Sequence, residues 1–271
     1  RYFVDPTPAA LPANVISVSM ARVPGEPTCP DNKPCRHIWE KVWRSWLWVA
    51  THELHLAEWF AKVDDDTFLF PENLRWFVQH RRMDSAERHY FGQQLFHTPK
   101  PIISGVATFF SRATIKALGE VYSTMPRKPV LHGTKGHRAG YSCEDRAGAT
   151  EEISTAICLF GVGITPTAVR DDSQKELVLI DSPDNMLLWK KLRWWYWQGR
   201  PEGVRDGADS LSDRPFAFHK YKGAGQLEYM NGVLYGDGKA LRQYDHAVGR
   251  KSHCKGPKAK ERCGNRRLTK R

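Results

Sequence analysis

Several signatures of common enzyme and membrane folds are missing from this chain of 271 residues. It has no Walker P-loop and no GxGxxG turn, which excludes a P-loop NTPase and a dinucleotide-binding Rossmann enzyme. No apolar run approaches the roughly 20 residues of a membrane span, and no signal-peptide pattern follows Arg1. CxxC spacing is also absent, which argues against a structural zinc site. What remains is ordinary globular composition, with 41% hydrophobic residues.

The net charge of +11 is concentrated at one end of the chain. Between Leu241 and Arg271 there are eleven Lys or Arg residues and two acidic ones, whereas residues 1–240 are almost balanced. A basic groove across a folded domain would spread this charge over many elements. We therefore expect no nucleic-acid partner and predict that 241–271 is a basic, disordered tail.

The six cysteines fall into three pairs of near neighbours. An even number of cysteines in locally closed pairs is typical of an oxidising compartment, where disulfides persist. The pairs are Cys29/Cys35, Cys143/Cys158 and Cys254/Cys263.

Strand and helix patterns alternate along the chain, which predicts an α/β fold with a mostly parallel sheet flanked by helices. The expected strands cover 2–4, 15–18, 59–63, 90–91, 101–110, 164–169 and 216–221, with a turn at Ser104-Gly105. Expected helices cover 37–56 and 150–160, and two more begin at Pro71 and after an N-cap at Ser111.

Three consecutive carboxylates, Asp64, Asp65 and Asp66, follow the apolar run 59–63. Carboxylates packed together repel one another unless a cation lies among them, and oxygen clusters suit Mg²⁺, Ca²⁺ or Mn²⁺. The alternative is a solvated acidic turn. Because apolar residues stand on both sides of the triplet, we predict a metal site at the end of a buried strand.

The residues around this triplet resemble the core 1 β1,3-galactosyltransferases, which are related to the fringe-like β1,3-glycosyltransferases. Residues 59–78 read WFAKVDDDTFLFPENLRWFV, and in the family a W-F-x-K-A-D-D-D-T-Y pattern leads into N-L-R-W. Weaker similarity extends from about residue 36 to 221. The resemblance implies a GT-A fold, in which an α/β domain binds a nucleotide sugar.

The resemblance also implies a Mn²⁺ or other divalent cation and a UDP-sugar donor. Asp66 matches the metal-binding last carboxylate of the family motif, and Asp64 and Asp65 would orient the ribose and the metal's water shell. His219, in a segment similar to the family's late F-H-Y, would be a further metal ligand together with Asp64. Without the resemblance, a histidine between apolar residues is typically structural.

A catalytic base is expected near the start of the helix 150–160. Glu152 matches by position the acidic residue proposed as the base in the family, with Glu151 as the alternative. The family's Asp is here a Glu, and the Gly that follows in the family is here Ala156. Two glutamates at a helix N-terminus are also favoured by the helix dipole alone, so both interpretations stay open. In the family a cysteine pair brackets this motif, which implies a disulfide between Cys143 and Cys158.

Two further segments match family positions near the substrates. Ser104 and Gly105 match the start of an S-G-G turn that lets the backbone approach the donor sugar, although Val106 replaces the second glycine. An aromatic run matches a W-Y-W-rich segment on the acceptor side, where rings can stack on sugars; big aromatics are otherwise core residues. The run comprises Trp194, Trp195, Tyr196 and Trp197.

By this resemblance the chain would be an inverting β1,3-glycosyltransferase that transfers galactose from UDP-galactose to O-3 of GalNAc linked to Ser or Thr of a glycoprotein. The alternatives are a fringe-like enzyme with another donor or acceptor and a non-catalytic chaperone or sugar-binding relative. Residues 1–240 would be the catalytic domain, truncated before the first strand that grips the uridine. The full-length protein would be a type II membrane protein of the Golgi lumen, its anchor absent from this chain, and a homodimer.

Overall fold

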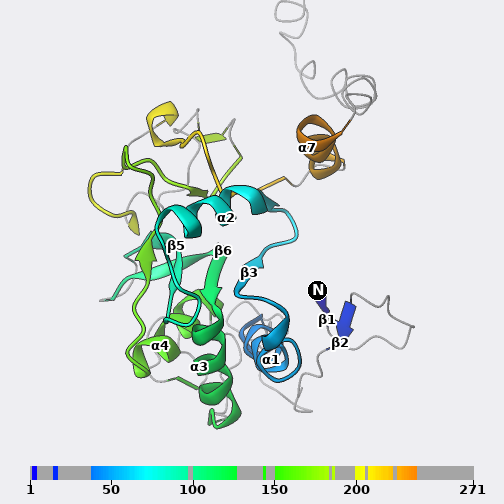
Figure 1. Ribbon diagram of the computed structural model, residues 1–271, viewed down its shortest axis with the longest axis vertical. Helices are drawn as coiled ribbons and strands as arrows, with labels where there is room; N and C mark the ends of the chain where they lie inside the picture. Colours follow the sequence, from blue (N-terminus) through cyan, green and yellow to red (C-terminus); the bar gives the residue numbers. More distant parts are fainter. Residues whose placement is uncertain are drawn as a thin grey trace, which may run out of the picture.

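The computed structural model describes residues 2–4, 15–17, 38–96, 100–126, 143–144, 150–182, 185–186, 199–204, 207–221 and 225–236 (Figure 1). The helices are α1 (Ile38–His52), α2 (Pro71–His80), α3 (Arg112–Ser123), α4 (Glu151–Gly161) and α7 (Gln226–Tyr235), with 3₁₀ turns at Leu54–Leu56 and Gly207–Ser210. The strands are β1 (Tyr2–Val4), β2 (Val15–Ser17), β3 (Trp59–Val63), β4 (Phe68–Leu69), β5 (Tyr90–Leu95), β6 (Ile102–Ser111), β7 (Thr167–Ala168), β8 (Val178–Leu179) and β9 (Ala217–Phe218). This is a mixed α/β fold, as the sequence predicted.

The sheets are mixed, so the prediction of a mostly parallel sheet is wrong for the described residues. The largest sheet has the order β3-β6-β5-β7, and β6 runs antiparallel to both of its neighbours. A smaller sheet has the order β4-β9-β8, and β1 pairs with β2 in parallel. Only residues 96–101 separate β5 from β6. A parallel pair needs a crossover of a dozen or more residues, so this short connection forces antiparallel pairing.

Both faces of the large sheet are buried. Neighbouring residues on β6 point to opposite faces, and each face has its own packing partner. Phe110 packs edge-on against Trp46 of α1 at a centroid distance of 5.0 Å. Phe109 faces the other side, where it meets Phe216 at 5.7 Å. Helices α1, α3 and α4 lie on the Phe110 side, and α2 lies across the other side (Figure 1). Phe216 directly precedes β9, so this contact packs the smaller sheet against the larger one.

Several local predictions hold in detail. Ser111 is the N-cap of α3, since the amide of Thr114 donates to its hydroxyl at 3.3 Å. Helix α4 ends at Gly161, and Cys143 and Cys158 form a disulfide. The strands expected at 164–169 and 216–221 shrink to β7 and β9. Among the described residues, no helix has the length and apolar character needed to cross a membrane.

Candidate active site

The three carboxylates that follow β3 differ in their exposure to solvent. Asp64 and Asp66 are half-buried, whereas Asp65 between them is exposed. The turn is fixed by its backbone: the amide of Asp64 donates to the carbonyl of Val106 at 3.3 Å, and that of Thr67 donates to the carbonyl of Asp64 at 3.1 Å. This turn brings two of the three expected carboxylates to the side of His219 and leaves Asp65 exposed.

His219 lies opposite these two carboxylates, because β9 pairs with β4 directly after the turn. Its Nε2 lies 2.7 Å from Asp66 Oδ1 and 3.6 Å from Asp64 Oδ2. Its Nδ1 lies 3.1 Å from the carbonyl oxygen of Ile180. A carbonyl can only accept, so Nδ1 donates to it, and Nε2 is the ring nitrogen that faces the two carboxylates. One ligand atom from each of Asp64, Asp66 and His219 lies within 4.8 Å of the others.

The residue after His219 has an unusual backbone that holds the histidine in place. Lys220 has φ of +69°, a left-handed conformation that costs a non-glycine residue about 1–2 kcal/mol. Its ammonium donates to the buried carboxylate of Asp181, and the amide of Tyr221 donates to the carbonyl of Asp66 at 3.0 Å. The sequence gave no sign of this strained position, which is typical of functional sites.

Lys62 connects the carboxylates to the start of helix α4. Its Nζ donates to Asp64 Oδ1 at 2.7 Å, to the carbonyl oxygen of Gly105 at 2.8 Å and to the carboxylate of Glu151. Sequence reasoning missed Lys62, although its position two residues before Asp64 on a strand predicts that both point to the same side.

Glu151 and Glu152 both lie in the first turn of α4, beside Gly105. Burial raises the pKa of Glu151, and the ammonium of Lys62 acts in the opposite direction. Lys62 thus contacts Glu151, which the sequence ranked second as a catalytic base. Glu152 lines a small cavity together with Glu151 and Lys62.

Ser104 and Gly105 lie inside strand β6, where its register with β5 shifts, so they form an irregularity within one strand and not the expected turn between strands. Ser104 is buried, and its carbonyl accepts from the hydroxyl of Thr108 at 3.3 Å. A Cβ atom at Gly105 would lie 2.9 Å from Glu151 Oε1. The glycine therefore leaves room for the Glu151 carboxylate, and a contact of Ser104 or Gly105 with a donor sugar stays a prediction.

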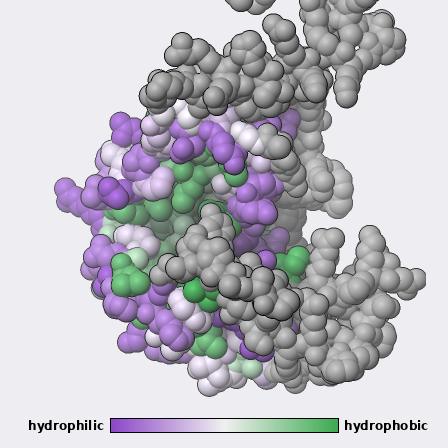
Figure 2. Space-filling model, turned by 90° about the vertical axis from the view of Figure 1, so that its right-hand side faces the viewer, coloured by the Kyte–Doolittle hydropathy of each residue, from purple (hydrophilic) through white to green (hydrophobic). Residues whose placement is uncertain are grey.

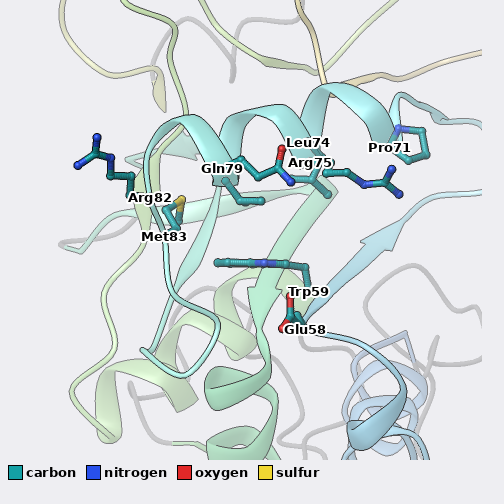
Figure 3. A pocket seen from close by; sticks show the side chains of 9 residues that line it. Glu58, Trp59, Pro71, Leu74, Arg75, Gln79, Arg82 and Met83 are labelled. Atoms are coloured by element: carbon teal, nitrogen blue, oxygen red, sulfur yellow. The ribbon is translucent and has the colours of Figure 1, made fainter.

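The aromatic run Trp194–Trp197, the tail 241–271 and the cysteines at 29, 35, 254 and 263 lie outside the described residues. A separate groove of about 490 Å³ lies between α2 and the start of β3, where the ring of Trp59 faces the helix (Figure 3). No predicted site residue lines this groove. Its walls comprise Glu58, Trp59, Pro71, Leu74, Arg75, Val78, Gln79, Arg82 and Met83. The side of the molecule shown in Figure 2 also carries a hydrophobic area bordered by hydrophilic residues.

Comparison with known proteins agrees with this geometry. No protein-family model matches the chain. The chain is, however, 25% identical over 185 residues to the glycoprotein-N-acetylgalactosamine 3-beta-galactosyltransferase 1 of Xenopus laevis, which covers 67% of this chain and 47% of that protein. At this low identity, the chain is similar to one core 1 β1,3-galactosyltransferase. It spans about half the length of the relative that it matches.

The name of this relative describes a galactosyltransferase, which gives the Asp64, Asp66 and His219 group a chemical context. Carboxylates and an imidazole at the end of a strand are ligands that a divalent cation prefers. The donor sugar, the acceptor and the roles of single residues go beyond the relationship and are proposals.

Proposed function

We propose that this chain is a metal-dependent inverting β1,3-glycosyltransferase that transfers galactose from UDP-galactose to O-3 of GalNAc on Ser or Thr of a glycoprotein. The observation that carries the proposal is the convergence of Asp64, Asp66 and His219, joined through Lys62 to the glutamates of α4. The named relative acts on the same pair of sugars.

The three ligand residues fit a divalent cation. Two ligands at right angles around an ion such as Mg²⁺, bound at about 2.1 Å, lie about 3.0 Å apart. Asp66 Oδ1 and His219 Nε2 lie 2.7 Å apart, so a small opening of this pair suffices. The hydrogen bond from Nδ1 to Ile180 fixes the ring so that Nε2 faces the two carboxylates, where it would be the ligand atom, as in many histidine metal sites. When bound, the ion would act as a Lewis acid that neutralises charge on the departing diphosphate.

The acidic residues of α4 would serve the acceptor. In an inverting transfer, the acceptor oxygen forms a bond to the anomeric carbon while the bond from that carbon to the diphosphate breaks. The hydroxyl proton passes to a carboxylate on the acceptor side, which must be ionised before the reaction. Glu151 and Glu152 are the candidates, since burial raises the pKa of Glu151 toward the range of an effective base. Asp65, Ser104 and Gly105 would contact the donor, and Trp194–Trp197 would contact the acceptor.

A donor screen tests this proposal directly. UDP release from UDP-galactose and other UDP-sugars is measured on a GalNAc-peptide, with Mn²⁺ present and after chelation. We expect release with UDP-galactose that depends on Mn²⁺ and on the peptide. Transfer from a different UDP-sugar favours a fringe-like specificity, and peptide binding without any transfer favours a non-catalytic relative.

A further inference from the structure

Lys62 occupies the centre of the candidate site, yet neither the family motif nor the comparison gives it a role. It lies on β3 between the metal-binding candidate Asp64 and the α4 residue Glu151. The side chain is 21% exposed. Burial lowers the pKa of its ammonium, but the neighbouring carboxylates outweigh this effect, so the net direction is upward and the charge is retained.

The ammonium of Lys62 has no donor left for a ligand. An ammonium carries three N–H donors. Three acceptors surround it: Asp64 Oδ1 at 2.7 Å, the Gly105 carbonyl oxygen at 2.8 Å and Glu151 Oε1. These acceptors come from the end of β3, the middle of β6 and the start of α4. The geometry is therefore that of an internal tripod and not of a group that binds phosphate.

We propose that Lys62 is a positioning residue that fixes the carboxylate of Glu151 and makes Glu151 the base of the transfer. By occupying Oε1, it leaves Oε2 as the oxygen that accepts the proton of the acceptor hydroxyl. Catalytic bases are commonly oriented by a third group in this way. The inference rests on the proposed function, and it selects Glu151 over Glu152.

The same tripod sets the distance between the proposed metal-binding residues and the proposed base. Lys62 holds Asp64, on the donor side, and Glu151, on the acceptor side, against the backbone of Gly105. If charge alone mattered, an arginine would serve equally well. A guanidinium is a planar fork, and it cannot direct three donors to acceptors arranged around a single nitrogen.

Kinetics of Lys62→Met and Lys62→Arg test the proposal. We expect kcat to fall by about 100-fold in Lys62→Met, because a misplaced base loses most of its effect, with a much smaller change in KM for the acceptor peptide. Lys62→Arg should restore less than a tenth of the wild-type kcat. Lys116→Met, at an exposed site on α3, is the matched control and should behave as wild type. Unchanged kcat in Lys62→Met, or full activity in Lys62→Arg, would overturn the proposal.

A double-mutant cycle in stability separates this inference from the proposed function. Urea unfolding is measured for Lys62→Met, Glu151→Gln and the double variant. We expect the double variant to lose less stability than the two single variants together, because each single change already breaks the same contact. Additive losses would show that Lys62 does not hold Glu151, whatever the activity. A wild-type chain that releases no UDP would instead refute the proposed function, and the cycle would still decide whether the tripod exists.

Discussion

A methyl group added at Gly105 should disturb the site while leaving the fold intact. The Cβ of an alanine would lie 2.9 Å from Glu151 Oε1, which is closer than an ordinary van der Waals contact. The carboxylate is the end of a flexible side chain, so it can swing away without a shift of the backbone, although it then loses its contact with the Lys62 ammonium. Gly105 has no left-handed backbone, and a Gly→Ala change at such a position gains about 0.4–1 kcal/mol from the unfolded chain. The gain and the lost contact oppose each other, so the free energy of unfolding should change by less than about 2 kcal/mol.

The activity of Gly105→Ala should fall steeply for the same reason. When the Glu151 carboxylate is displaced, it loses its contact with the Lys62 ammonium. It also moves away from the position that the proposed mechanism requires beside the acceptor. Misplacing a reacting group by about 1 Å costs on the order of 100-fold in rate. UDP release at saturating donor, peptide and Mn²⁺ measures this loss.

Gly119→Ala is the matched control, in which we expect a loss of stability without a loss of activity. Its Cβ would lie 2.5 Å from the Cβ of Ala50, where helices α1 and α3 cross. Both atoms are bound directly to backbone, so the helices must move apart, and overpacking of this kind costs about 1–3 kcal/mol. We expect reduced stability in urea with kcat near the wild-type value. A Gly105→Ala variant with full activity would refute the assigned position of Glu151, and one as unstable as Gly119→Ala would refute the mobility of its carboxylate.

Three further predictions concern the metal, the backbone beside it and pH. His219→Ala should weaken Mn²⁺ binding in calorimetry at least about tenfold, with the exposed His52→Ala as control. Lys220→Gly and Lys220→Ala lose the same ion pair, but the glycine variant should be more stable to urea by about 1 kcal/mol because glycine adopts φ of +69° without strain. Burial raises the pKa of Glu176 from its ordinary 4.5 to about 7, so the folded state favours the protonated carboxyl. The free energy of unfolding should therefore fall by about 3 kcal/mol as the pH rises from about 4.5 to above 7. Urea unfolding of Glu176→Gln should no longer show this fall.

The elements were predictable where the local signal was strong. Ser111 before an apolar helical period gave the start of α3, and the apolar run before the acidic triplet gave β3. The direction of the strands was not predictable from their alternation with helices, because direction depends on connection length. The Ser104-Gly105 pair was misread as a turn, although the apolar residues on both sides favour one continuous strand.

The group proposed to bind a metal was predicted from two motifs that lie far apart in the sequence. Asp66 and His219 meet only because β4 pairs with β9, a contact that periodicity cannot reveal. Lys62 and Gly105 were within reach of simple physical reasoning. Strand alternation places Lys62 on the side of Asp64, and pairing of β3 with β6 places Gly105 nearby, but the pairing itself came from the structure.

The balance of charge links the metal to the base. Asp64, Asp66 and Glu151 lie within one network, and Lys62 supplies a single ammonium to two of them. Burial raises the pKa of Glu151, and the charges of Glu152 and Asp64 raise it further, so an added positive charge nearby favours the ionised form. A divalent ion between Asp66 and His219 would provide that charge, and it would also leave Lys62 to hold Glu151. The same ion that neutralises the departing diphosphate would thereby help to keep the base ionised, which is the state that must precede proton transfer.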